Sequence, residues 1–225
     1  PLYSAMELCT RDLAALADGF AGITIGRRDA GNHMVFGDAM VQEIIKRSGI
    51  ARIRDSSFRD LTRIYSDFIS IEGEVQAPSD RLEIYASNIH VNSQNIHFPM
   101  ALPESGITAD TLLLNLSEHL LVGGWVRAFD SAEIEVHGTA GAASVTTDLG
   151  SFIESLNPGS IVDIDTVKDI NIAGTVEVFG EGSRVDIDTE GAFTLMEGGL
   201  IAARDAEALV DIYAAGTTLF RMLTG

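Results

Sequence analysis

The stretch Ile170-Asn-Ile-Ala-Gly-Thr-Val-Glu-Val178-Phe-Gly-Glu-Gly-Ser-Arg-Val185-Asp-Ile187 decides the fold. It holds three apolar pairs, each with one residue between its members, and Gly-rich segments separate the pairs. Alternation with a period of two, bounded by Gly, Asn, Asp and Ser, is typical of short strands joined by turns. Similar pairs occur upstream, namely Leu82-x-Ile84, Ile89-x-Val91, Ile96-x-Phe98, Leu112-x-Leu114 and Ile134-x-Val136.

The apolar residues also repeat at a fixed spacing of 25 positions. One series is Leu120, Val145, Ile170, Leu195 and Phe220, and a second is Val162, Ile187 and Ile212. Strands too short to bury a face alone, repeated every 20 to 50 residues, are typical of solenoids in which like positions stack on one another. We therefore predict an all-β fold, a single-stranded right-handed parallel β-helix with about 25 residues per coil. The right hand is assigned from the usual coil length.

The first 48 residues follow this pattern less well. Ser4-x-x-Glu7 has the spacing of a helix capping box, and the apolar residues that follow it favour an amphipathic helix ending before Gly19. Residues 38–48 fit either a second short helix or an irregular first coil. We predict an N-terminal cap with a short helix and a first irregular coil over residues 1–48, and the parallel β-helix over 49–225.

Charge and composition exclude several classes of protein. The formal net charge is −18, and nucleic-acid binders need a basic surface. Hydrophobic residues make up 46% of the chain, which suits a protein with a real core, yet no stretch approaches the roughly 18 apolar residues of a membrane span. Cys9 is the single cysteine, so the chain forms no internal disulfide. The start at Pro1 is expected for a piece of a longer protein or a processed product.

One segment resembles a known family. Ala17-Asp-Gly-Phe-Ala-Gly-Ile-Thr-Ile-Gly-Arg27, followed thirty residues later by Ser57-Phe-Arg-Asp60, is similar to an element of very large bacterial secreted and surface proteins of the filamentous-haemagglutinin-like, adhesin type. The resemblance covers about a fifth of the chain. It implies a β-solenoid, a location outside the cell or on its surface, and a role in adhesion or envelope structure. It carries no catalytic residues.

Carboxylates recur at the same spacing as the apolar residues. Asp163 to Asp188, Asp186 to Asp211 and Asp165 to Glu190 are each separated by that interval, so we expect them to stack on the outside of successive coils. Like charges about 5 Å apart repel by roughly 3 kcal/mol in an effective dielectric near 20, and a divalent cation would relieve this. A calcium site is therefore one of two interpretations of this strip. The alternative is a solvated acidic face, with Arg184 and Lys168 as partial counter-charges. The candidate ligands are Asp163, Asp165, Asp186 and Asp188.

No catalytic or cofactor motif accompanies this strip. The five histidines lack the spacing of metal ligands, and the glycines between residues 19 and 26 form no dinucleotide fingerprint. We therefore predict a structural or adhesive solenoid segment of a larger exported or cell-surface protein, without catalysis. Expected partners are another protein, a surface glycan, or further copies through solenoid ends or faces. Two alternatives stay open, namely a polysaccharide-active β-helix enzyme (lyase or hydrolase) that uses the acidic strip with Arg184, and an assembly subunit of a larger complex.

Overall fold

The computed structural model of the chain describes residues 23–26, 33–37, 62–65, 68–72, 74–91, 105–137 and 144–215. Within these ranges all regular structure is β-strand, and no helix occurs, so the all-β prediction is confirmed there. The predicted helix of the N-terminal cap, the ambiguous segment 38–48 and the predicted strand Ile96–Phe98 lie outside the described residues. The described part of the predicted cap, 1–48, contains two strands.

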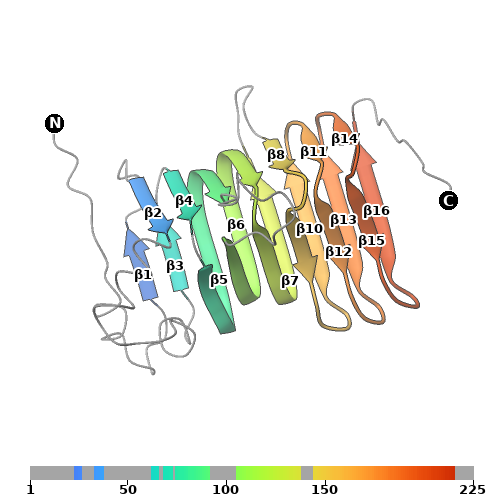
Figure 1. The fold of residues 1–225 in the computed structure, drawn as a ribbon, viewed down its shortest axis with the longest axis horizontal. Coiled ribbons are helices and arrows are strands. Elements are labelled where there is room, and N and C mark those ends of the chain that lie inside the picture. Colours follow the sequence, from blue (N-terminus) through green and yellow to red (C-terminus); the bar gives the residue numbers. More distant parts are fainter. Residues whose placement is uncertain are drawn as a thin grey trace.

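The strands form one parallel sheet that wraps around an apolar interior (Figure 1). Every strand pair recorded between described residues is parallel, as the sequence predicts. The N-terminal strands are β1 (Ile23–Gly26), β2 (His33–Gly37), β3 (Thr62–Tyr65), β4 (Phe68–Glu72), β5 (Glu74–Val91), β6 (Gly106–Val122), β7 (Trp125–Val136) and β8 (Ser144–Thr147). The C-terminal strands are β9 (Phe152–Ser155), β10 (Ile161–Thr166), β11 (Ile170–Ile172), β12 (Thr175–Val178), β13 (Arg184–Thr189), β14 (Phe193–Leu195), β15 (Leu200–Ala203) and β16 (Leu209–Ala214).

The pairings arrange the strands in three columns. The first column runs β1-β3-β5-β6-β7-β10-β13-β16. The second joins β2, β4, β5, β6, β8, β11 and β14, and the third joins β5, β6, β7, β9, β12 and β15. The long strands β5 and β6 take part in all three columns, and the pairing between them shifts register where the chain passes from one column to the next.

Like residues stack inside the columns. The first column aligns six branched side chains on successive strands, and all six are fully buried. Side chains of a strand alternate between its two faces. On each of these strands, the residues directly before and after the buried one therefore point outward. The buried row is Ile64, Ile84, Leu114, Ile134, Ile164 and Ile187. This row forms part of one continuous core shared with the other two columns.

The predicted period holds for some repeats only. Leu120 aligns with Val145, Val145 with Ile170, and Ile187 with Ile212, as predicted. The prediction is wrong for Leu195, because Ile170 aligns with Phe193, and for Val162, which aligns with Val185. Both of these steps are shorter than predicted by two positions, and Phe220 lies outside the described residues.

The difference of two positions between these steps comes from the length of the connection between the second and third columns. This connection has four residues between β8 and β9 and between β14 and β15, but two between β11 and β12. In the two-residue connection, a Cβ on Gly174 would lie 2.6 Å from the carbonyl oxygen of Ser151, so glycine is needed there. Thr147 Oγ1 accepts hydrogen bonds from the backbone N–H groups of Ala173 (3.1 Å) and Gly174 (2.9 Å). The shorter connection removes two residues from its repeat.

Candidate functional site

The four predicted site residues lie together on the outer face of the first column. Asp163 and Asp165 come from β10, Asp186 and Asp188 from β13, and they alternate with fully buried valine and isoleucine. Asp163 is in register with Asp186, and Asp165 with Asp188. The predicted pairs Asp163–Asp188 and Asp165–Glu190 are therefore wrong by two positions, because this repeat is shorter than the predicted period. The predicted pair Asp186–Asp211 is confirmed.

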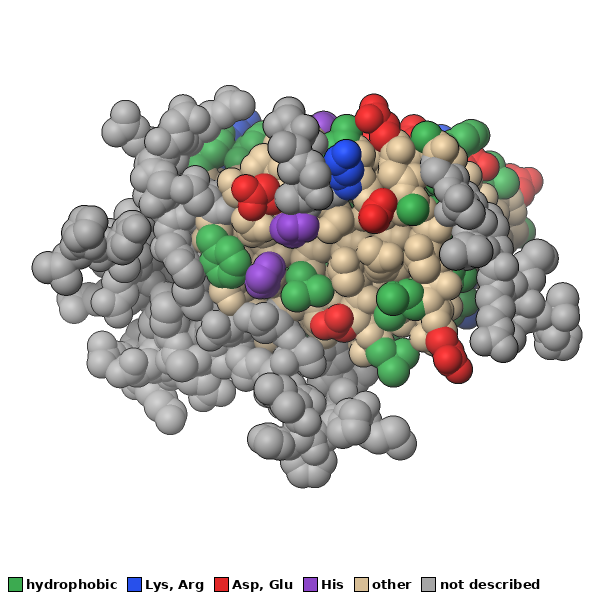
Figure 2. All heavy atoms as spheres, turned by 90° about the horizontal axis from the view of Figure 1, so that it is seen from above, with side chains coloured by type: hydrophobic (Ala, Val, Ile, Leu, Met, Phe, Trp, Pro, Cys, Tyr) green, Lys and Arg blue, Asp and Glu red, His purple; other side chains and the backbone are tan. Residues whose placement is uncertain are grey.

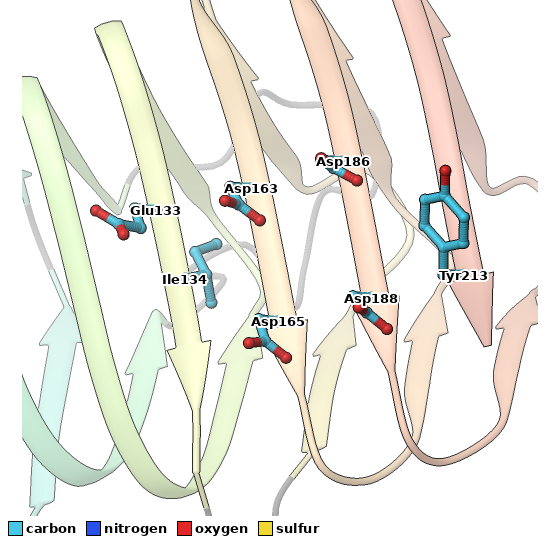
Figure 3. A pocket seen from close by; sticks show the side chains of 7 residues that line it. All are labelled: Glu133, Ile134, Asp163, Asp165, Asp186, Asp188 and Tyr213. Atoms are coloured by element: carbon cyan, nitrogen blue, oxygen red, sulfur yellow. The ribbon is translucent and has the colours of Figure 1, made fainter. Parts of the chain in front are cut away.

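These side chains line a hollow of about 280 Å³ (Figure 3). Glu133 and Ile134 of β7 border it on one side, and Tyr213 of β16 on the other. The carboxylates project from neighbouring strands on the same side of the sheet, while the Tyr213 ring stands at the edge and is 61% exposed. The fixed spacing missed Glu133, because extra residues between β7 and β8 lengthen that repeat, so that Ile134 aligns with Ile164.

The hollow is an acidic surface with an arginine at two of its carboxylates, and Arg81 Nη2 lies 3.8 Å from Glu133 Oε2. Arg184 Nε lies 3.5 Å from Asp186 Oδ2, so the predicted counter-charge at Arg184 is present. Lys168 is exposed in the connection between β10 and β11. In the part of the chain that the structure describes, no three His, Cys, Asp or Glu side chains converge closely enough to hold a metal ion. Calcium binding by the four aspartates stays a prediction.

A second polar cluster lies on the same outer face, nearer the N-terminus. Glu83 is 7% exposed and accepts hydrogen bonds from Arg63 Nε (2.8 Å), Arg81 Nε (2.8 Å) and Tyr85 Oη (3.0 Å). Burial raises the pKa of Glu83, but the hydrogen bonds from Arg63, Tyr85 and Arg81 outweigh it, so the net pKa lies below its usual value. The ring of Tyr85 stacks on that of Tyr65, with centroids 4.8 Å apart. The sequence analysis did not identify this cluster.

The outer face of the third column carries the chain's single tryptophan. Trp125 is half-buried, lies in register between Gly106 and Phe152, and donates its indole N–H to Thr108 Oγ1 (3.2 Å). A Cβ on Gly106 would lie 2.2 Å from Trp125 Cδ2 and 2.3 Å from Cε2, so the indole covers the Gly106 backbone. The ring therefore lies flat on β6.

Two arginine–glutamate pairs lie on the same outer face as the tryptophan, and the first is adjacent to it. Arg127 Nε donates to Glu154 Oε1 (2.6 Å), and Arg204 Nε donates to Glu177 Oε2 (2.5 Å). Glu154 and Glu177 are in register and are 6% and 7% exposed. Each buried carboxylate is thus neutralised by one half-exposed guanidinium.

Two histidines lie on the outer face of the second column. His119 Nδ1 lies 2.9 Å from Ser144 Oγ, on the strand with which it is in register. The ring of His90 contacts that of Phe68 edge-on, and burial, followed by the nearby His119, lowers the pKa of His90. Both histidines are strand residues, whereas the sequence analysis left the histidines without a role.

Comparisons with known proteins add no relative. No protein-family model, curated protein or solved structure matches the chain. Among the described residues, no helix is long and apolar enough to cross a membrane.

Proposed function

We propose that the chain is a right-handed parallel β-helix, a solenoid that acts as a rigid structural or adhesive segment of a larger exported or cell-surface protein and catalyses no reaction. One observation carries the proposal, namely the stacking of six fully buried side chains from Ile64 to Ile187 on successive parallel strands. A chain that stacks like residues in this way gains length with each repeat, at roughly 4.8 Å per strand.

The mechanism of such a segment is mechanical. Each central strand is hydrogen-bonded to a strand on either side, and the core is continuous through the three columns. Bending or compressing the body would separate strands or open the core, and both are costly in a close-packed interior. The three outer faces then present repeated side chains to a partner at fixed spacing. The resemblance at residues 17–27 and 57–60 supports a location outside the cell.

The polysaccharide-active enzyme is the weaker alternative. The hollow on the first column is lined by five carboxylates, which would repel an acidic polysaccharide. Arg184, the basic residue of the lyase hypothesis, is paired with Asp186. These charges favour binding of neutral or cationic partners over cleavage of a polyuronate.

The assembly subunit is supported by one observation. The last described strand of the first column, β16, exposes three large side chains, Leu209 (58%), Val210 (38%) and Tyr213 (61%). Exposed apolar residues at a sheet edge favour association with a further strand. Static light scattering over a wide concentration range tests this role, since an assembly that pairs with itself increases in mass with concentration.

A binding-and-turnover assay tests the proposed function. Purified chain is applied to immobilised polysaccharides and bacterial cell walls, and the supernatants are assayed for new reducing ends and unsaturated sugars. We expect retention on at least one surface without release of either product. Steady product release that scales with protein concentration would overturn the non-catalytic role. Failure to be retained on any surface would remove the adhesive role and leave the structural one.

A further inference from the structure

The outer face around Trp125 has the features of a small ligand-binding surface. The indole lies against the Gly106 backbone on one side, so its opposite face points away from the sheet. The hydrogen bond from the indole N–H to Thr108 fixes the rotation of the ring. An aromatic ring held in this way presents a flat apolar face at little cost in conformational entropy on binding.

Polar groups stand next to the ring. Arg127 follows Trp125 by two residues, so it points to the same side of β7, and its side chain is 39% exposed. Glu154 accepts from the Nε and Nη2 groups of Arg127, which orients the guanidinium. A guanidinium has five N–H donors, so Arg127 can also donate to a ligand hydroxyl. Gln76, in register with Thr108, adds a half-buried amide at the same level of the column.

Charge decides the class of ligand. The Arg127–Glu154 pair is neutral as a unit, the neighbouring Glu177 is neutralised by Arg204, and the whole chain carries a net charge of −18. An anionic ligand would meet no uncompensated cation here. A neutral pyranose instead places its C–H groups, which carry partial positive charge, on the negative face of the indole, and its hydroxyls beside Arg127 and Gln76.

We propose that Trp125 is the stacking platform of a carbohydrate-binding subsite for a neutral hexopyranose, with Arg127 donating to a sugar hydroxyl. The inference rests on the proposed adhesive function and names its partner class. Glu154 is a positioning residue that holds the guanidinium. Gly106 is part of the subsite, because any side chain there would displace the indole.

The single tryptophan makes the site directly observable, because all indole emission comes from Trp125. The full chain is titrated with cellobiose, lactose and N,N′-diacetylchitobiose, and with an anionic heparin tetrasaccharide. We expect a saturable change in emission with at least one neutral disaccharide, with a dissociation constant on the order of 1 mM, and none with the heparin fragment. The absence of a saturable change with all three neutral disaccharides would overturn the proposal.

Variants distinguish a specific role of the Trp125 ring in binding from general effects of changing the surface. Trp125→Leu keeps an apolar cover on Gly106 but removes the ring, and calorimetry should show at least tenfold weaker binding. Gly106→Ala should shift the emission of the free protein and weaken binding, because the new Cβ displaces the indole. Met196→Ala, at an exposed position in the connection between β14 and β15, should bind as the wild type does. Unchanged binding by Trp125→Leu with a native circular dichroism spectrum would contradict the subsite.

The two proposals fail in different ways. If Trp125→Leu still adheres to a glycan-coated surface as the wild type does, the adhesive function stands and the subsite is wrong. If the wild-type emission titration saturates with a disaccharide but the reaction mixture accumulates hydrolysed sugar, the subsite stands and the non-catalytic function is wrong.

Discussion

At the scale of single residues, Glu83 shows how this chain keeps a charge nearly inaccessible to water. The lost solvent is replaced by three donors from two strands, namely the guanidiniums of Arg63 and Arg81 and the hydroxyl of Tyr85. A buried carboxylate is tolerated only when its oxygens are satisfied in this way. The Glu154 and Glu177 pairs follow the same rule with one arginine each. Arginine suits all three sites because its fork of donors is rigid.

Replacing Glu83 by Gln should lower the free energy of unfolding by about 1–3 kcal/mol at pH 7, because hydrogen bonds from two guanidiniums lose their charged acceptor. The folded-state pKa of Glu83 lies below its unfolded value, so its stabilisation is present above the unfolded pKa of about 4.3 and is lost as pH falls through the folded pKa. Urea unfolding of both proteins between pH 7 and pH 3 measures the difference. It should be constant near neutrality and shrink in acid. Glu181→Gln, in an exposed turn, is the control, and an equal loss there would contradict the assignment.

At the scale of elements, the length of one connection sets the register of the sheet. The sequence alone predicts parallel strands and the alignment of Val145 with Ile170, because that repeat contains the four-residue connection. The sequence also predicts the alignment of Leu120 with Val145, since the two-residue connection between β6 and β7 is offset by the longer connection between β7 and β8. It does not predict the alignment of Ile170 with Phe193, since a two-residue connection keeps the same strand pattern and shortens only the turn. A difference of two residues also preserves the inward and outward alternation, so periodicity gives no warning of it.

Thr147 stabilises the two-residue connection, which gives a prediction for that element. Thr147→Val keeps the shape of a fully buried side chain but removes the hydroxyl that accepts from the N–H group of Gly174, whereas the N–H group of Ala173 keeps the backbone carbonyl of Thr147 as an acceptor. We expect a loss of about 1–3 kcal/mol in the free energy of unfolding, because the buried N–H group of Gly174 loses its acceptor. Chemical denaturation measures it. Thr146→Val, one residue earlier and on the outer face, should change stability by much less.

Removing one negative charge from the acidic hollow should raise the stability of the fold. Asp188 lies in register with Asp165, and like charges on neighbouring strands are destabilising by a few tenths to about 1 kcal/mol. Asp188→Asn should therefore raise the midpoint of thermal unfolding at low ionic strength, and the gain should fade in high salt. Glu197→Gln in an exposed turn changes net charge equally and should have little effect. An equal gain in both variants would mean that overall charge, and not the hollow, is responsible.

The predicted calcium site has a separate test at the same place. If Asp163, Asp165, Asp186 and Asp188 bind calcium in the native state, millimolar calcium should raise the midpoint of thermal unfolding. Magnesium at equal ionic strength is the control for screening, since it prefers a smaller, octahedral site. Asp186→Asn should remove the calcium-specific part of the shift. Identical curves with calcium, with magnesium and without either would contradict calcium binding.

At the scale of the whole molecule, charge is distributed over the outside of a nearly uniform apolar interior. Acidic side chains occur at more places than basic ones on the face in Figure 2, in keeping with the net charge of −18. The sequence could predict the acidic strip on β10 and β13, because those strands alternate strictly. It could not predict Glu133 beside it, since that residue comes from a longer repeat, whereas Tyr213 follows Asp188 at the predicted interval and lacked only the acidic side chain that marked the strip. The Trp125 platform depends on Gly106, nineteen positions away, and leaves no local sequence signal.

Cysteine cross-linking on the outer face tests most directly the central claim, that successive repeats stack in the register described. In a Cys9→Ser background, three double variants are treated with a fluorogenic reagent that bridges thiols a few ångströms apart. Asp163→Cys with Asp186→Cys should react efficiently, because these residues are in register on neighbouring strands. Asp163→Cys with Asp188→Cys should react less, and Asp163→Cys with Asp211→Cys, two strands or roughly 10 Å apart, should not react. Failure of the first pair in a folded protein, or equal reaction of all three, would contradict the stacked architecture.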